Sequence, residues 1–188
     1  TDSLMHCGFL MGPGPCDVVY ELGFPWPPNP KCGVNQLPDT YNKTGPFGVT
    51  ATTSDLDGTV VGCSLFVSLN GAKVDSMEMV STAPDVWEAD FTVAGAAGDE
   101  ISYQAVATDN DGLEGASFLT IFDIIEPDNP GADLLIVGDD MRLNEIYYAV
   151  LDDLGYTYEY WDIDAHAGID ASVTGWGWGT IIVAGWGL

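Results

Sequence analysis

The sequence predicts a multi-domain β plus α/β chain, in which an antiparallel β-sandwich is followed by a small, incomplete parallel α/β unit. Two changes of pattern carry this prediction. Apolar and polar residues alternate with period two through residues 46–125, whereas a wholly apolar strand and a helical period follow from residue 133. Residues 126–132 are rich in Pro, Asp and Gly, so we expect them to be an interdomain linker.

Residues 1–45 are expected to form an irregular leader rich in Cys and Pro. Residues 24–30 contain four prolines, and this density is incompatible with a helix interior or a central strand. The leader either wraps the sandwich that follows or is the tail of a preceding domain. The expected division is therefore 1–45 leader, 46–125 sandwich, 126–132 linker and 133–188 α/β unit.

Four segments predict the strands of the sandwich. Apolar residues alternate with polar ones at 63–70, 87–93 and 101–107, which is typical of half-buried strands. Residues 116–123 are apolar on both faces, which predicts a strand that is covered on both sides or packed against a neighbouring domain. Asn70-Gly71 is a strong signal for a tight hairpin turn. Short strands separated by turn signals favour a sandwich.

The α/β unit begins with a short apolar strand at 134–137, as in a buried parallel sheet. Asp139 and Asp140 are suited to the start of the next helix. A helix is expected next, because Ile146, Tyr147, Val150, Leu151 and Leu154 recur at helical spacing, and Gly155 is expected to end it. Strands are predicted at 156–161 and 180–184. Three strands do not complete a doubly wound sheet.

The charge balance excludes several classes of partner. The 188 residues contain 29 Asp and Glu against four Lys and Arg, which gives a net charge of −25. Such a chain repels phosphate backbones and anionic lipid, so neither nucleic-acid binding nor membrane insertion is expected. Adaptation to a salty medium and bound divalent cations are two compatible explanations of the charge.

Two acidic turns suggest a calcium site. Asp55 and Asp57 lie in one turn, and Asp109 and Asp111 lie in another. In a sandwich these turns fall at the same end, so four carboxylates would converge there. Ca²⁺ binds six to eight oxygens and tolerates irregular geometry. The alternative is ordinary turn chemistry, because Asp bonds to nearby backbone and Gly accepts positive φ.

A second, weaker candidate metal site lies in the α/β unit. Asp139 and Asp140 follow its first strand, at the edge where open α/β sheets place their functional groups. Asp162 and Asp164 follow the second strand, with His166 close behind them, and are expected to lie near this edge. The other role that the sequence gives to Asp139 and Asp140 is to cap the helix that follows them.

The cysteines indicate a secreted, extracellular or cell-surface protein. Cys7, Cys16, Cys32 and Cys63 are even in number and lack the paired spacing of a zinc site. We expect disulfides, with Cys7–Cys16 favoured because a Gly-Pro-Gly-Pro turn lies between them, which leaves Cys32–Cys63. The other pairings and free thiols stay open as alternatives.

Three late tryptophans are candidate interface or glycan-binding residues. Trp176, Trp178 and Trp186 lie among glycines, and such aromatics stack on sugars or anchor interfaces. The ordinary interpretation is that they cover the sheet. For catalysis, His6 and His166 are the only histidines and no nucleophile elbow is present, so the chain is expected not to be an enzyme.

Some segments resemble known families of modules. Residues 42–51 look like the opening of an Ig-like or fibronectin-III-like module, and residues 101–109 with Asp111-Gly112 resemble its penultimate strand and turn. Residues 134–140, Tyr147-Tyr148 and residues 154–156 are similar to a flavodoxin-like domain. This order of modules resembles large secreted bacterial surface proteins and peptidases, in which such modules serve spacing, adhesion or assembly.

The expected function is therefore a structural, assembly or adhesion module of an extracellular protein or filament, which is non-catalytic and stiffened by disulfides and calcium. Its expected partners are other copies of itself or other surface proteins. Two alternatives remain open: an accessory fragment of a secreted hydrolase such as a peptidase, and a carbohydrate-binding module.

Overall fold

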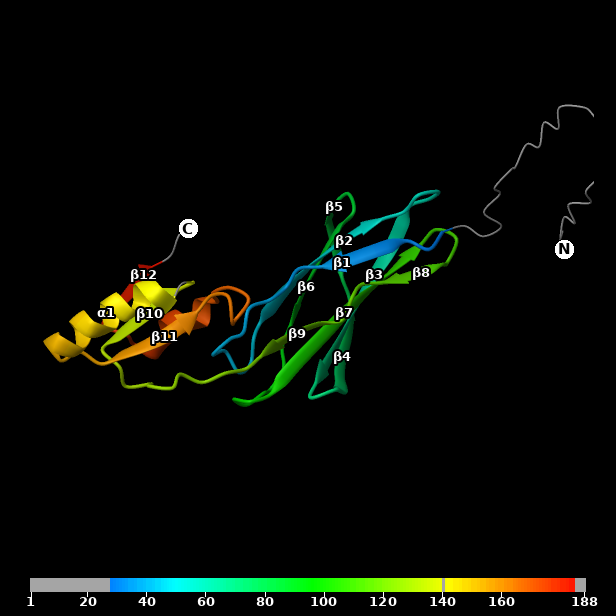
Figure 1. Ribbon diagram of the computed structural model, residues 1–188. Coiled ribbons are helices and arrows are strands. Elements are labelled where there is room, and N and C mark those ends of the chain that lie inside the picture. The colour runs from blue at the N-terminus through cyan, green and yellow to red at the C-terminus, as the bar shows by residue number, and fades with distance from the viewer. Residues whose placement is uncertain (1–27, 140, 185–188) are drawn as a thin grey trace, which may run out of the picture.

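Two antiparallel sheets and one parallel sheet make up the structure, a computed structural model that describes residues 28–139 and 141–184 (Figure 1). The antiparallel strands are β1 (Lys31–Val34), β2 (Phe47–Ser54), β3 (Val60–Leu69), β4 (Ala72–Glu78), β5 (Val80–Ala83), β6 (Val86–Phe91), β7 (Glu100–Asp109), β8 (Glu114–Ala116) and β9 (Thr120–Asp123). The later elements are β10 (Leu134–Gly138), α1 (Met141–Leu154), β11 (Tyr158–Asp162), the 3₁₀ helix η1 (Ala171–Trp176) and β12 (Thr180–Ala184).

The antiparallel strands form the predicted sandwich. One sheet has the order β1-β2-β6-β5, and the other has the order β4-β3-β7-β8, with β9 also paired to β7. Alternation places Val49, Leu65 and Tyr103 between the sheets, where each is at most 1% exposed. Burial of a large apolar side chain contributes about 1.5–3 kcal/mol, so this shared core holds the sheets together.

The hairpin between β3 and β4 confirms one turn prediction. Asn70 has φ 50° and Gly71 has φ 76°, and two consecutive positive values are the signature of a tight primed turn. The Asn70 carboxamide also accepts a hydrogen bond from the backbone N–H of Glu100, at 3.0 Å. This bond ties the hairpin to the start of β7.

The single strand expected at 116–123 is wrong. Pairing along β7 is interrupted between β8 and β9, because the Ser117 hydroxyl accepts the backbone N–H of Ala105 at 3.1 Å in place of a strand carbonyl. Phe118 and Leu119 then project into solvent, with 93% and 60% of their surface exposed. The apolar run therefore reflects an exposed kink in the strand and not a segment covered on both faces.

Part of the expected leader belongs to the sandwich. Residues 31–34 form β1, which pairs antiparallel with β2 from Lys31–Ser54 to Val34–Ala51. The irregular leader expected over 1–45 is therefore wrong for these residues, although the proline-dense segment does end just before them. The position of β1 at the edge of its sheet explains why prolines are tolerated next to it.

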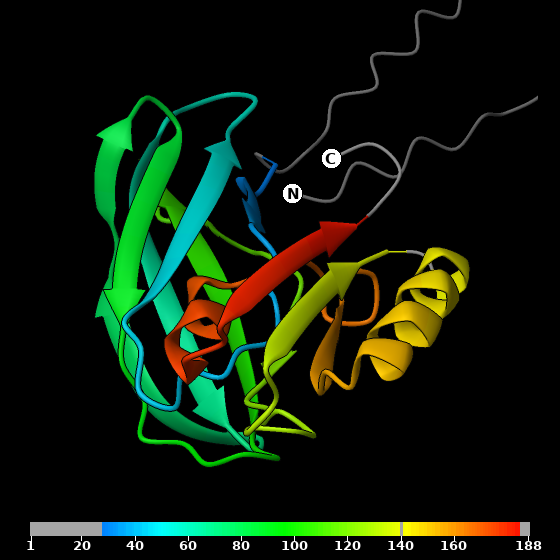
Figure 2. The ribbon, with the colours of Figure 1, turned by 90° about the vertical axis from the view of Figure 1, so that its left-hand side faces the viewer.

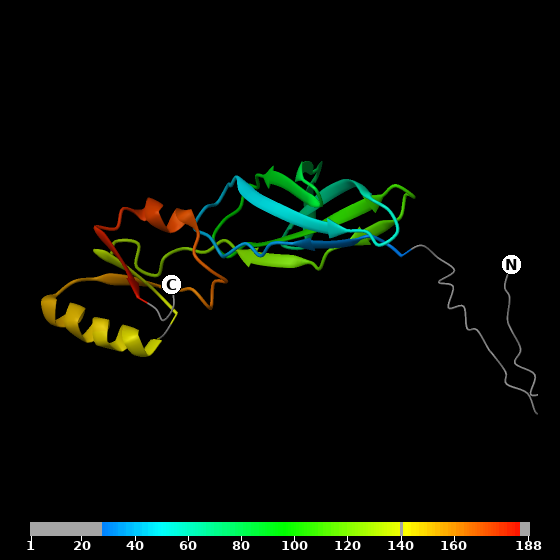
Figure 3. The same cartoon turned by 90° about the horizontal axis from the view of Figure 1, so that it is seen from above.

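The last three strands form a small parallel sheet in the order β11-β10-β12. The central strand β10 is buried along its whole length, as its apolar sequence predicts. Figure 3 shows η1 and α1 on opposite faces of this sheet. Leu135 and Val137 face the η1 side, and Leu134 and Ile136 face α1.

Helix α1 is present as predicted, and Gly155 follows its last residue with φ 77°. The apolar residues at helical spacing are only partly buried. Leu151 is buried, but Ile146, Val150 and Leu154 are between 53% and 65% exposed. The helix packs instead through Leu151 and Tyr148. Within the described residues, no helix has the length and apolar character that a membrane span requires.

The parallel sheet lies at one end of the sandwich (Figures 1 and 2). The turn after β2 and the turn between β7 and β8 lie at the opposite end, near the first described residues. The sandwich therefore separates two ends of different character, an acidic pair of turns and the small parallel sheet.

Candidate functional site

The two acidic turns meet at one end of the sandwich, as the sequence predicts. Asn110 joins them through two hydrogen bonds to Thr59. The Asn110 side-chain oxygen accepts the Thr59 backbone N–H at 2.7 Å, and the Asn110 backbone N–H donates to the Thr59 carbonyl at 3.0 Å. A Cβ on Gly58 would lie 2.3 Å from that side-chain oxygen, so the close approach of the turns requires glycine there.

The four aspartates of these turns have different roles. Asp109 is 3% exposed, and its carboxylate accepts the backbone N–H groups of Asp111 and Leu113, both at 2.8 Å. It therefore shapes its own turn. Asp55 has one buried carboxylate oxygen that lacks a hydrogen-bond partner. Asp55 also lies close enough to Asp57 for a side-chain hydrogen bond.

The pKa of Asp57 is raised above its usual range. Desolvation is the largest cause, followed by the hydrogen bond with Asp55 and by repulsion from Asp55 and Asp111. The Asp57 side chain is exposed, and two carboxylates oppose its ionisation, that of Asp55 in the same turn and that of Asp111 in the facing turn. Across the described ranges, no group of three or more His, Cys, Asp or Glu side chains is placed to hold a metal ion.

The described residues of the second candidate metal site have separate roles. One Asp162 oxygen accepts the backbone N–H of Asp164 at 3.0 Å and that of Ala165 at 3.1 Å, so it forms a turn. Asp139 lies at the end of β10 with one buried oxygen that has no hydrogen-bond partner. Asp140 lies outside the described residues. His166 points elsewhere, toward Asp39.

The predicted cysteine pair Cys32–Cys63 lies across the sandwich. Cys32 is on β1 and Cys63 is on β3, in opposite sheets, and both are free thiols in the structure. They lie close enough to share a hydrogen bond, which lowers the pKa of Cys32 and raises the pKa of Cys63; burial raises the Cys63 value further. Cys7 and Cys16 lie outside the described residues, so their pairing stays a prediction.

Two of the predicted tryptophans help to cover the parallel sheet. Trp176 packs edge-on against Tyr41 with ring centroids 5.6 Å apart, and the Trp178 indole N–H donates to the Val173 carbonyl at 2.6 Å. Trp186 lies outside the described residues. Trp176 also lines an open groove of about 640 Å³ with Tyr41. Lys43 and Asp170, which line it too, are already bonded to Glu126 and to the Ser172 N–H.

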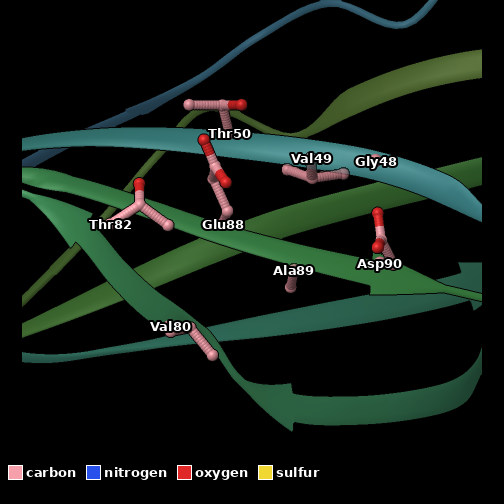
Figure 4. Close-up of a pocket in the computed structure, with 8 residues that line it drawn as sticks. All are labelled: Gly48, Val49, Thr50, Val80, Thr82, Glu88, Ala89 and Asp90. Carbon is pink, nitrogen blue, oxygen red and sulfur yellow. The ribbon is translucent and has the colours of Figure 1, made fainter.

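A second hollow, of about 380 Å³, lies on the outer side of the β2-β6-β5 sheet (Figure 4). Small and acidic side chains line it, among them those of Thr50, Thr82, Glu88 and Asp90. None of its lining residues is aromatic. This hollow therefore lacks the stacking surface on which the expected glycan-binding alternative depends.

A set of polar contacts joins the sandwich to the part of the chain that follows it, and the sequence did not predict them. Asp39 accepts from His166 Nδ1 at 2.9 Å, and the Asp39 backbone N–H donates to the His166 carbonyl at 3.0 Å. The Ser172 hydroxyl accepts the Tyr41 N–H at 2.9 Å and lies 3.0 Å from the Thr40 hydroxyl. We call this set of contacts, which residues 39–41 make, the junction.

Aromatic rings complete the junction. Tyr41 is 6% exposed and lies edge-on to the fully buried Trp161, with centroids 5.0 Å apart. The His166 ring lies 4.6 Å from the same Trp161 ring. Burial, and then repulsion from Glu159 and Asp128, raise the pKa of Tyr41, so its hydroxyl stays neutral at any physiological pH.

The linker is also fixed by a buried carboxylate. Glu159 on β11 is 6% exposed and accepts the backbone N–H groups of Asp128 at 3.0 Å and Asn129 at 2.6 Å. Hydrogen bonds to an ionised group contribute about 1.5–3 kcal/mol each. The linker expected at 126–132 is therefore held against the parallel sheet.

No protein-family model and no curated protein sequence matches the chain. Solved structures that are similar to it include fibronectin(III)-like modules of Clostridium thermocellum CbhA, with 18% identity, a TM-score of 0.35 and coverage of 52% of this chain and 47% of that one. The structure of BhCBM56 is 12% identical over 51% of this chain and 92% of its own, with a TM-score of 0.33.

A polysaccharide deacetylase from Bacillus cereus is 15% identical, with a TM-score of 0.38 over 82% of this chain. This chain spans about half the length of that protein and of the CbhA structure, 50% and 47% respectively. At these values the similarities assign neither a family nor an activity to the chain.

Proposed function

We propose that this chain is a non-catalytic structural module of an extracellular or cell-surface protein. In this proposal an Ig-like or fibronectin-III-like sandwich and a partial flavodoxin-like unit act together as one rigid arm for assembly or adhesion. The observation that carries the proposal is the junction. It commits Asp39, Tyr41 and His166 to fixing one part on the other.

The junction supports rigidity because it combines several kinds of contact. Tyr41 is buried against two rings, and truncation of a buried aromatic side chain to Ala typically costs about 3–5 kcal/mol. Domains joined by a small polar interface move relative to one another by default. A buried aromatic centre with hydrogen bonds around it and a fixed linker is the arrangement expected of a spacer that holds its ends apart.

An extracellular location is part of the proposal. Cys32 and Cys63 face each other between the two sheets, where a disulfide would lock the sandwich, and such bonds persist in oxidising compartments. The excess of carboxylates also suits a medium rich in salt or divalent cations.

Calcium at the acidic turns is the finer part of the proposal. The partnerless oxygen of Asp55 and the repulsion between Asp57 and Asp111 would both be relieved by a bound cation. Calcium titration followed by thermal unfolding tests this part. If calcium raises the midpoint of thermal unfolding in wild type but not in Asp55→Asn, this part is supported. An equal rise in wild type and variant would mean that calcium only screens the net charge.

Rigidity is tested by small-angle X-ray scattering and limited proteolysis of the full chain and two variants. Tyr41→Ala removes the centre of the junction, and Tyr156→Ala removes a half-exposed tyrosine as the matched control. We expect one elongated particle and slow cleavage at 126–132 for wild type and control, with faster cleavage in Tyr41→Ala. A wild type that is already cleaved as fast as Tyr41→Ala would refute the rigid arm.

A further inference from the structure

Helix α1 has an apolar flank that nothing in the described chain covers. Its members are Ile146, Tyr147, Val150 and Leu154, which are 64%, 39%, 53% and 65% exposed. Single exposed apolar residues are common on protein surfaces, but a run along one side of a helix marks an interaction site. The flank extends over the last nine residues of the helix.

The helical geometry shows which way this flank faces. Tyr148 stacks on Tyr158 of β11 at 4.9 Å, and Leu151 packs on Leu134 and Ile136 of β10. Successive residues of an α-helix are about 100° apart around its axis. Going around the helix from Tyr148 to Leu151 and onward, the next positions are the members of the flank. Since β11, β10 and β12 lie in that order, Tyr147 and Leu154 lie on the β12 side of α1, and Val150 and Ile146 continue the flank toward solvent.

The edge strand β12 is open on this side. Ile182 pairs in register with Ile136 and therefore lies on the α1 face of the sheet. It is only half-buried, because α1 packs over β10 and β11. The flank and Ile182 together form an apolar step beside α1, of the kind that a second helix fills in layered α/β structures.

The charge around this step indicates which kind of partner would bind there. Residues 133–188 contain ten Asp and Glu and one basic residue, Arg142. The three lysines of the described chain all lie before the linker. Asp153 lies next to Ile146 around the helix and borders the flank, whereas Asp152 lies beside Tyr158 of β11. Asp139, at the end of β10, has a buried oxygen without a hydrogen-bond partner. A second copy of this chain or an anionic lipid surface would meet like charge.

We infer that the step beside α1 docks an amphipathic helix of a basic partner protein, with an apolar stripe on the flank and Lys or Arg facing the carboxylates. This inference rests on the proposed role in assembly and names the surface that performs it. Helix-in-groove recognition uses the same combination of apolar anchors at helical spacing and charged borders.

The test uses a labelled helical peptide of leucine and lysine, about as long as α1, and measures its binding to the full chain by fluorescence anisotropy. Val150→Asp places a charge in the flank. Val80→Asp is the matched control, because Val80 is 67% exposed on the edge strand β5 of the sandwich. Both variants add one carboxylate, so general attraction of a cationic peptide predicts equal or slightly tighter binding for both.

We expect the dissociation constant to rise at least tenfold in Val150→Asp and to stay within twofold of wild type in Val80→Asp. A leucine and glutamate peptide of the same pattern is expected not to bind. Equal binding to both variants, or equal binding of the glutamate peptide, would overturn the inference.

Sedimentation equilibrium distinguishes the other occupants. A wild-type dimer that Val150→Asp abolishes would mean that a second copy covers the flank, and it would also overturn the inference. Scattering and proteolysis of the junction do not depend on this flank. Failure of the peptide test with a rigid wild type therefore refutes the docking surface alone, and a flexible wild type refutes the proposed function.

Discussion

Oxidation of Cys32 and Cys63 is expected to stabilise the sandwich strongly. The bond would close a loop of about 30 residues, and the loss of chain entropy in the unfolded state then corresponds to about 3.5–4 kcal/mol at 25 °C. The structure favours such a bond, because Cys32 packs against the core cluster that contains Cys63, close enough for the two thiols to share a hydrogen bond. The pKa of Cys32 is lowered by its hydrogen bond with Cys63, so the partly exposed Cys32 is the thiol that ionises and starts the exchange.

The assay is urea unfolding of the Cys7→Ser, Cys16→Ser double variant, compared with and without a reductant. With a slope of about 1–3 kcal/mol/M, the expected gain moves the midpoint by about 1–4 M. Further replacement of Cys63 by Ala supplies the control, whose midpoint should not respond to the reductant. Equal midpoints for oxidised and reduced protein, with the bond verified by mass, would refute the reasoning.

Three smaller predictions follow from the same structure. Because the fold raises the pKa of Asp57, its ionisation opposes folding; stability should rise as the pH falls through that raised pKa, and Asp57→Asn should abolish the rise in urea midpoint. The pKa of Asp99 is lowered by its bonds to Asn70 and the Ala96 N–H; stability from this group is lost as the pH falls through the lowered pKa, and Asp99→Asn should flatten that acid limb. Gly115→Ala would place a Cβ 1.6 Å from the Pro30 carbonyl oxygen, and the forced displacement should cost about 1–3 kcal/mol in the same unfolding measurement.

The sandwich was predictable because its strands alternate with period two and their inner residues are buried as that period requires. The break at Ser117 was not predictable in this way. It depends on a serine hydroxyl that replaces a strand carbonyl, which is a tertiary contact and leaves the apolar pattern unchanged. Helix α1 shows a related limit, since helical spacing identifies an apolar side but not whether another element lies against it.

The candidate site was predictable in part. Sandwich topology correctly placed the turns of Asp55 and Asp109 at one end, where Asn110 joins them. Asp109 accepts a hydrogen bond from the backbone of its own turn, which is the ordinary turn chemistry that the sequence offered as the alternative to calcium. The junction gave no signal in the sequence, because Tyr41 and Trp161 are far apart in the chain and neither belongs to a motif.

The two ends of the molecule are too far apart to influence each other electrostatically. Strand β7 runs from Glu100, which pairs with Asp123 next to the junction, to Asp109 at the acidic turns. Its ten residues span roughly 30 Å at about 3.3 Å each, whereas the screening length in 0.15 M salt is about 8 Å. A cation at the acidic turns therefore cannot change peptide affinity at α1 through charge. Peptide binding should be the same with calcium and with a chelator, and a dependence on calcium would mean that the sandwich transmits a mechanical change through the junction.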